Sequence, residues 1–312
     1  ITGATGLIGQ YMIGFFIQSL KTNYKPKKIF LISKSNLPTH LNFLKKNKYF
    51  EHRKINLSNI SKLHIGKFDY TIHGATYGQP LKFTKNDIET IILNTTTTNE
   101  LIKITNKKGK FLFISSSEVY SGLNKSKLRE DDIGNTNPSH FRSCYIESKR
   151  CGEAIINAYR KKKYDTKSAR LCLAYGPGVK KDDNRVLNEF IKKAMINKKI
   201  TIAGGENNIR AYIYIVDAIK MLINILFFGK KELYNVGGVK KHSILDLAKH
   251  VAEELQVPFV YKKDKKNNKG APNHVQIDIS KYKKEFKNIK FTNLKNGLKK
   301  TIVWHKILFG KR

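Results

Sequence analysis

The chain opens on ITGATGLIGQ, in which Gly3, Gly6 and Gly9 recur at every third position between a strand-like start and an apolar helical run. Glycine at the first position permits a backbone angle that other residues avoid. At the second it lets a phosphate approach the main chain, and at the third it lets a helix pack closely on a strand. The first-turn amides of Leu7 and Ile8, at the positive end of the helix dipole, favour a diphosphate. The pattern predicts a dinucleotide-binding turn, although a glycine triplet also occurs in plain turns.

Almost nothing precedes this turn, and the chain has no initiating Met. A strand of usual length, about five residues, needs several more residues in front of Gly3. We therefore expect most of the first strand of the sheet to be missing.

Length and cysteine usage narrow the class of protein. At 312 residues the chain is long enough for a large domain with a second lobe. No apolar run reaches the roughly 18 residues that a membrane-spanning helix needs. The three cysteines, Cys144, Cys151 and Cys172, have neither metal-ligand nor redox spacing. We expect no metal, no membrane span and a reducing, cytoplasmic location.

The net charge of +36 comes from 60 basic residues, of which only nine are Arg. They are spread over the whole length, whereas nucleic-acid binders more often gather basic residues on one face or segment with Arg prominent. Compositional drift toward Lys, Asn and Ile explains the charge as well as a function does. We expect no nucleic-acid partner, and a basic field that attracts an anionic substrate.

Apolar runs that read as strands, at 27–33, 50–57, 70–76 and 110–117, alternate with helical patterns, one of which covers 86–106. This alternation predicts an α/β fold with a doubly wound parallel sheet. Ligands on such sheets bind beyond the carboxyl ends of the strands.

That edge should carry the glycine turn together with Ser33, Asn56, Ala75 and the serines at 115–117. From about residue 176 the pattern loosens into Gly-, Pro- and Asn-rich loops between shorter helices. We predict a dinucleotide-binding domain over 1–175, with a return segment near 210–236, and a smaller substrate-binding lobe that makes up most of 176–312.

Tyr145 and Lys149 lie at i and i+4 on a helix predicted over 141–162, and hence on one face. A nearby ammonium lowers the pKa of a Tyr, which can then act as a base. Composition alone yields such pairs, and Tyr24/Lys28, Tyr159/Lys163 and Tyr261/Lys265 have the same spacing. Only Tyr145 follows a hydroxyl-rich strand end, so context selects it. The apolar stripe of this helix is predicted at Cys151, Ala154, Ile155 and Ala158.

With these motifs the chain resembles the extended short-chain dehydrogenase/reductases, in the epimerase/dehydratase family that acts on nucleotide sugars. The resemblance covers nearly the whole chain and rests on TGATGLIG, IHGAT, LNTTTTNELI, ISSSEVY, CYIESK, LAYGPG, IRAYIYIVDAI, YNVGG and FTNLKNGLKKTIVW in this order. It implies a Rossmann-type sheet, a bound NAD or NADP, a nucleotide-diphosphate sugar as substrate, and a homodimer.

The resemblance also implies roles. Tyr145 would take the proton of the sugar C4 hydroxyl, and Lys149 would lower its pKa and hold the nicotinamide ribose. Ser116 would orient the substrate. Glu118 matches a carboxylate that dehydratases use at C5 and decarboxylases keep near the sugar acid; a solvated loop carboxylate is the alternative.

Substrate contacts are expected from Tyr77 and from two arginines, Arg210 and Arg185, which match diphosphate-binding positions; ordinary surface arginines are the alternative. NAD-using relatives carry an Asp where this chain has Ser33, followed by Lys34. Loss of the carboxylate removes repulsion of a 2′-phosphate, and a lysine can pair with one, so we favour NADP over NAD.

Asn56 and Leu57 take the place of the usual acidic contact to adenine, and Ala75 completes the cofactor-binding set by resemblance.

The motifs leave the type of reaction open. The segment around Tyr145 is most similar to UDP-glucuronate decarboxylases, but that family's Asn and Arg are replaced by Leu173 and Gly270. Because 4,6-dehydration needs Glu118 but no such Arg, we rank it first, decarboxylation second and C4 epimerisation third.

A non-enzymatic alternative is an RNA-binding module on the same fold, which the charge of +36 would suit. The intact Tyr145, Lys149 and Ser116 argue for an enzyme.

Overall fold

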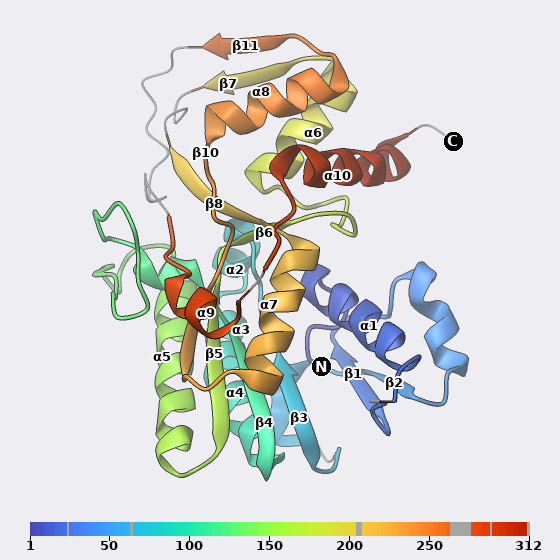
Figure 1. Ribbon diagram of the computed structural model, residues 1–312, viewed down its shortest axis with the longest axis vertical. Helices are drawn as coiled ribbons and strands as arrows, with labels where there is room; N and C mark the ends of the chain where they lie inside the picture. Colours follow the sequence, from blue (N-terminus) through green and yellow to red (C-terminus); the bar gives the residue numbers. More distant parts are fainter. Residues whose placement is uncertain (24, 63–64, 204–207, 263–275, 288, 311–312) are drawn as a thin grey trace. The chain divides into compact units, whose positions relative to one another are not determined.

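The computed structural model describes residues 1–23, 25–62, 65–203, 208–262, 276–287 and 289–310, and Gly270 lies outside this set. The chain divides into two compact units (Figure 1). The first comprises residues 1–119, 136–170 and 219–234, and the second comprises residues 120–135, 171–218 and 235–312.

The first unit alternates strands and helices. In chain order its elements are α1 (Leu7–Ser19), β1 (Ile29–Ser33), η1 (Thr39–Lys46), β2 (Phe50–Lys54), η2 (Leu57–Lys62), β3 (Phe68–His73), α2 (Pro80–Lys85), α3 (Asp87–Asn94), α4 (Thr96–Lys103), β4 (Thr105–Ser116), α5 (Ser143–Lys161) and β5 (Asp165–Leu171). Three further elements, η3 (Ser117–Tyr120), α7 (Ile215–Phe228) and β9 (Leu233–Val236), cross the division between the units, and Leu171 at the end of β5 belongs to the second unit.

The strands form a Rossmann-type sheet. β1 pairs in parallel with β2, and β3 pairs in parallel with β4 in the order β3-β4-β5-β9. Thr2 makes parallel bridges to both Ile32 and His73, so residue 2 lies at the central strand position between β1 and β3. The predicted α/β fold with a parallel sheet is therefore confirmed, and the carboxyl ends of β1, β3 and β4 share the edge that carries the glycine turn.

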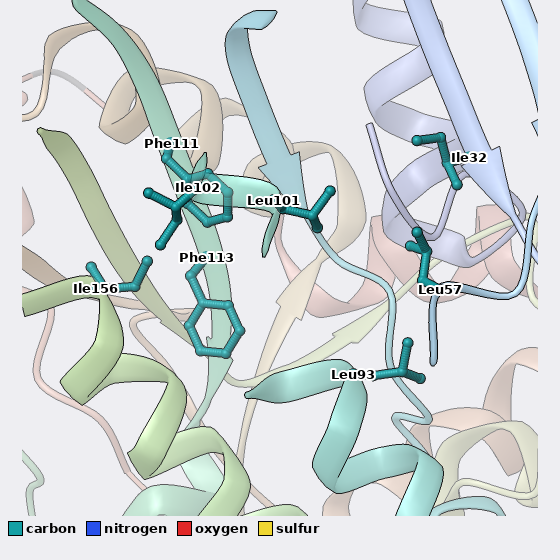
Figure 2. Close-up of a cluster of buried hydrophobic side chains, with 8 residues drawn as sticks. All are labelled: Ile32, Leu57, Leu93, Leu101, Ile102, Phe111, Phe113 and Ile156. Carbon is teal, nitrogen blue, oxygen red and sulfur yellow. The ribbon is translucent and has the colours of Figure 1, made fainter. Parts of the chain in front are cut away.

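Helices cover both faces of this sheet. Successive side chains of β4 point to opposite faces, and each face contacts a helix. Phe111 and Phe113 belong to a buried cluster with Leu101 and Ile102 of α4 and Ile156 of α5 (Figure 2). On the opposite face, Lys110 of β4 donates from Nζ to the carbonyl of Phe227 in α7, 2.6 Å away. The buried cluster also contains Ile32, Leu57 and Leu93.

Two sequence predictions about helices are wrong. The helix expected over 86–106 is broken at Thr95, whose φ/ψ of −114°/−82° separates α3 from α4, and β4 begins at Thr105. Three of the four residues of the predicted apolar stripe of α5, Cys151, Ala154 and Ala158, are exposed, whereas Ile155 is partly buried and packs against the cluster of Figure 2. The buried face of α5 is instead formed by Tyr145, Ile146, Ser148, Lys149, Gly152 and Ile156.

The second unit combines small sheets with helices. Its elements are β6 (Leu173–Tyr175), α6 (Val186–Asn197), β7 (Ile200–Ala203), β8 (Ile209–Tyr214), β10 (Lys241–Ser243), α8 (Ile244–Leu255), β11 (Phe259–Lys262), α9 (Ser280–Glu285) and α10 (Leu294–Phe309). One sheet has the order β10-β8-β6, and β11 pairs in parallel with β7. Helices α6, α8 and α10 pack against one another.

His73 ties the central strand position to α3. Its Nε2 lies 2.9 Å from the Leu93 carbonyl, which can only accept, so Nε2 carries the proton and Nδ1 accepts from the Thr2 hydroxyl at 2.7 Å. The Thr2 hydroxyl in turn accepts from the amides of Gly74 and Ala75, each at 3.2 Å. Burial, together with the nearby Lys149 charge, lowers the pKa of His73 to about 3.

This network predicts a pH-dependent loss of stability. The unfolded chain takes up a proton at His73 below its ordinary pKa of 6.5, whereas the folded chain does so only near 3. Stability is therefore present above 6.5 and lost as the pH falls toward 3, by about 1.4 kcal/mol for each pH unit within that window. Urea unfolding of the wild type and of His73→Gln should show a shallower acid loss in the variant. Equal slopes would contradict this account.

Candidate active site

The glycine turn is built by close backbone approaches. Gly3 has φ of +73°, in the left-handed region that favours glycine, and a Cβ there would lie 2.7 Å from the Gly74 carbonyl oxygen. A Cβ on Gly9 would overlap the carbonyl oxygen of Gly3 and lie 2.7 Å from the Cα of Ala4. Gly9 therefore lets α1 pack tightly on the turn.

The start of α1 suits a diphosphate. Gly6 is the N-cap and contributes no side-chain cap, and no acidic residue lies in the first turn, so the amides of Leu7 and Ile8 have no competing side-chain carboxylate. Next to Ala75, the Thr76 hydroxyl is buried and has no hydrogen-bond partner among the described residues. These groups fit the diphosphate of a dinucleotide, and the sequence analysis missed Thr76.

The outer end of this site gathers residues from the ends of β1 and β2, the loop after β3 and helix α3. Ser33, at the end of β1, contacts the Ser35 carbonyl at 2.8 Å and His52 at 2.9 Å. Lys34 lies together with Tyr77 and Glu89. Leu57 is buried, and the Asn56 side chain accepts from the Ser58 amide at 3.4 Å. Tyr77, expected to contact substrate, is thus found beside a residue expected to contact cofactor.

Tyr145 lies on the buried face of α5 and is only 7% exposed. Its ring stacks on Phe83 of α2, with centroids 4.7 Å apart and planes 9° from parallel. The stacking fixes the plane of the phenol ring, which matters for a group that must present one oxygen to a substrate.

Lys149 is buried one turn further along α5. Its Nζ donates to the Ile114 carbonyl at 2.7 Å and lies 5.8 Å from the centroid of the Tyr145 ring. Burial lowers the pKa of Lys149 to about 7, although the charge of Glu153 opposes this. The predicted pair therefore shares one buried face at the carboxyl end of β4.

The serine-rich end of β4 carries the other predicted residues. Ser116 is buried and accepts from the amide of Glu118 at 3.2 Å. Glu118 accepts a hydrogen bond at 2.7 Å from Nη2 of Arg142, the residue just before α5. Arg142 also lies over the Phe83 ring, 5.6 Å from its centroid. Glu118 Oε2 and Arg142 Nε are buried without a hydrogen-bond partner in the described part of the chain.

A second acid of intermediate exposure, Glu153, contacts this end of β4. Glu153 accepts from the Ser115 hydroxyl at 2.6 Å and from Arg170 Nη2 at 2.8 Å. The sequence analysis missed Arg142 and Glu153, yet both are at helical spacing from the predicted pair, three residues before Tyr145 and four after Lys149. That spacing is the one sequence signal that could have identified them.

The two predicted arginines belong to the second unit. Arg185 pairs with the buried Asp183 at 2.6 Å. Burial alone would raise the pKa of Asp183, but the Arg185 contact outweighs it and the pKa is lowered. Arg210 donates to the Ile209 carbonyl at 3.0 Å. Both arginines act electrostatically on Tyr212, whose pKa burial nonetheless raises to about 12. The structure thus gathers them around one tyrosine.

Neither a metal-binding cluster nor a membrane-spanning helix occurs among the described residues. The described part of the chain contains no group of three or more His, Cys, Asp or Glu side chains placed to hold a metal ion. Within it, no helix combines the length and the apolar character needed to cross a membrane.

Comparison with known proteins identifies the family. Residues 1–237 match the model of the NAD dependent epimerase/dehydratase family. The chain belongs to this family. It is 27% identical over 257 residues to UDP-glucuronic acid decarboxylase 4 of Arabidopsis thaliana, a match that covers 82% of this chain and 56% of that protein. It is 29% identical over 201 residues to UDP-glucuronic acid decarboxylase 1 of Xenopus tropicalis, covering 64% and 48%. The chain thus spans about half the length of these curated relatives.

Solved structures share the fold at lower identity. A dTDP-glucose 4,6-dehydratase from Streptomyces venezuelae, a double mutant with NAD bound, superposes with a TM-score of 0.83 at 16% identity and covers 98% of this chain and 95% of its own. UDP-glucose 4-epimerase of Thermotoga maritima, with UDP-glucose, superposes with a TM-score of 0.80 at 20% identity and covers 98% and 97%. These likenesses show the fold and not the reaction.

The glycine turn yields a matched pair of variants. Gly9→Ala should weaken NAD binding by at least about tenfold, because its Cβ overlaps Gly3 and displaces the turn from the start of α1. Gly14→Ala, on the same helix, meets nothing within 4 Å and should bind NAD normally, with unfolding stabilised by up to about 1 kcal/mol. Isothermal titration calorimetry and thermal melts measure both. Normal NAD binding by Gly9→Ala would exclude the turn as the binding site.

Proposed function

We propose that this chain oxidises C4 of a nucleotide-diphosphate sugar with a nicotinamide dinucleotide, and then removes the sugar C6 carboxylate. The observation that carries the first half is the Tyr145–Lys149 pair on the buried face of α5, next to the carboxyl end of β4. The family of the chain supports the same chemistry.

In the proposed reaction Tyr145 accepts the proton of the C4 hydroxyl. The Lys149 ammonium stabilises the phenolate that Tyr145 must supply, and Ser116 holds the same hydroxyl in line. The bound dinucleotide supplies the hydride acceptor and later returns the hydride. Phe83 keeps the Tyr145 ring in one plane, which limits the positions from which its oxygen can reach the sugar.

Arg142 and Glu118 support decarboxylation as the second half. An unpaired Glu118 would repel a substrate carboxylate, but the Arg142 contact at 2.7 Å makes the pair neutral overall. Arg142 also keeps a buried Nε without a partner in the described residues, which leaves one donor for a carboxylate. This guanidinium would supply the cation that the sequence lacks at position 270, where the chain has Gly in place of the expected Arg. The curated relatives named above carry decarboxylase names.

A 4,6-dehydration is the second candidate. Glu118 Oε2 is buried without a hydrogen-bond partner in the described residues, so it has the free acceptor needed to remove a proton from C5. In this reading Arg142 only orients Glu118. The choice of reaction therefore depends on whether the substrate carries a carboxylate.

Product analysis tests the proposal. The protein would be incubated with NAD and, separately, UDP-glucuronate, GDP-mannose, dTDP-glucose and UDP-N-acetylglucosamine, and the products read by mass spectrometry. We expect loss of carbon dioxide from UDP-glucuronate alone. Loss of water from a neutral sugar would establish dehydration instead. An unchanged mass with altered retention would indicate epimerisation, and no product from any sugar would contradict the enzymatic proposal.

The variant Arg142→Met should reduce decarboxylation at least about tenfold, because a charge-assisted hydrogen bond is worth about 1.5–3 kcal/mol. Arg129→Met, at a position whose side chain is 71% exposed, is the control and should retain wild-type turnover. Equal decarboxylation rates for Arg142→Met and Arg129→Met would show that Arg142 takes no part in the reaction.

Further parts of the proposal concern binding and assembly. Arg185 and Arg210 would bind the substrate diphosphate, and the unpaired cysteines are compatible with a cytoplasmic enzyme.

A homodimer would bury the exposed apolar side chains of α3, Ile88 and Ile91, with the exposed face of α5 at Cys151 and Ala154. A monomeric mass by light scattering at micromolar concentration would contradict the dimer.

A further inference from the structure

Lys34, Tyr77 and Glu89 form a closed triangle of hydrogen bonds at the outer end of the glycine-turn site. Lys34 Nζ donates to Glu89 Oε2 at 3.0 Å and to the Tyr77 hydroxyl at 3.1 Å, and that hydroxyl donates to Glu89 Oε2 at 2.6 Å. The three residues come from the loop after β1, the loop after β3 and helix α3. They lie 43 and 55 positions apart from Lys34 in the chain, so the fold alone brings them together.

The triangle changes what Lys34 offers to a ligand. One positive and one negative charge make the group neutral, and the Tyr77 hydroxyl accepts a hydrogen bond from a second N–H of the ammonium. The Tyr77 hydrogen bond and the Glu89 contact both raise the pKa of Lys34, so the ammonium is charged but already neutralised. A 2′-phosphate would have to displace Glu89 and would then face an unpaired carboxylate.

Two other basic side chains near the end of β1, His52 and Arg53, offer no free charge in its place. His52, bonded to Ser33, has its pKa lowered by burial and by the charge of Lys45, so its ring is neutral at neutral pH. Arg53 is engaged by Glu51 at 2.7 Å. Lys45 stands nearby, on η1, without an ion pair described for it. Ser33 already contacts Ser35 and His52.

We infer that Glu89, positioned by Lys34 and Tyr77, is the residue that makes the site select NAD over NADP. This inference rests on the proposed dinucleotide site. The sequence lacks an acid at the end of β1, and Glu89 brings a carboxylate from α3 to Lys34, the residue that follows Ser33. A carboxylate accepts hydrogen bonds from ribose hydroxyls and repels a 2′-phosphate, so it discriminates between the two cofactors. Lys34, which favoured NADP in the sequence analysis, is thereby assigned the role of positioning Glu89.

Equilibrium binding tests this assignment without any turnover. Isothermal titration calorimetry would give the dissociation constants of NAD and NADP for the purified chain and for Glu89→Gln. The wild type should bind NAD at least about tenfold more tightly than NADP. In Glu89→Gln that ratio should fall at least about tenfold, mainly through tighter NADP binding, because Lys34 is released to meet the phosphate.

A matched control comes from the next helix. Glu100 of α4 pairs with Lys103 at 2.6 Å and has a side-chain exposure of 35%, close to the 33% of Glu89. Glu100→Gln should therefore leave both dissociation constants unchanged. Lys34→Met separates the two roles of the lysine. We expect it to weaken NAD binding, because Glu89 loses the lysine that positions it, whereas a lysine that served only as a 2′-phosphate ligand would change NADP binding alone.

The outcomes are distinguishable. A wild type that binds NADP as tightly as NAD, or an unchanged ratio in Glu89→Gln, overturns the role of Glu89 while the dinucleotide site stands. A wild type that binds neither dinucleotide overturns the site itself, and the inference with it. A melting temperature for Glu89→Gln matching that of Glu100→Gln shows that a changed ratio reflects the site and not a loss of folding.

Discussion

The close approach of α5 to β4 is the constraint on which the rest of the site depends. Gly152 makes this approach possible, because a Cβ there would lie 2.8 Å from the Asn94 carbonyl and would collide with the Phe113 ring. The approach brings Lys149 Nζ to the Ile114 carbonyl and places the Tyr145 ring against Phe83. It also buries the ammonium, which is why the pKa of Lys149 falls to about 7. A bulkier residue at 152 would push apart the two elements that carry the proposed chemistry.

Buried charges around the site occur in pairs, as their desolvation requires. Glu153 joins Arg170 and Ser115 behind the end of β4, and Glu118 joins Arg142 in front of it. Glu153 connects α5 to Ser115 of β4 and to Arg170 of β5, and Arg142, just before α5, contacts Glu118, just after β4. These contacts therefore fix the distance between α5 and the serine-rich end of β4. Within each pair, the two opposite charges also neutralise each other. Removing one partner would leave the other charge buried, which costs more than an exposed ion pair contributes.

Much of the fold could be predicted from the sequence because its signals are local. Three signals each depend on residues close together in the chain: the glycine triplet, the apolar strands and the Tyr145–Lys149 spacing. The parallel sheet that the strands predict is confirmed. The face of α5 was predicted wrongly for a physical reason. The usual rule assigns apolar residues to the core, but here the buried face carries Tyr145, Ser148 and Lys149, and the apolar Ala154 and Ala158 are exposed.

Contacts between distant segments escaped the sequence analysis. The Lys34–Glu89 and Glu118–Arg142 pairs join residues 55 and 24 positions apart, and no periodicity sets such pairings. The break at Thr95 was missed as well. Its hydroxyl bonds to the Ile91 carbonyl at 2.7 Å, a local bond that competes with regular helix geometry. A run of four threonines was a usable warning, since β-branched residues are weak helix formers.

The most direct test of the central claim is a rapid-mixing measurement of reduced nicotinamide absorbance when the NAD-loaded protein meets UDP-glucuronate. Tyr159→Phe removes the hydroxyl of a second Tyr-x-x-x-Lys pair, whose tyrosine lies on α5 and donates to Asn99, and should show the transient of the wild type. Tyr145→Phe should abolish the transient while still binding NAD. A transient that survives in Tyr145→Phe would contradict the claim that this tyrosine, held on the buried face of α5, takes the C4 proton.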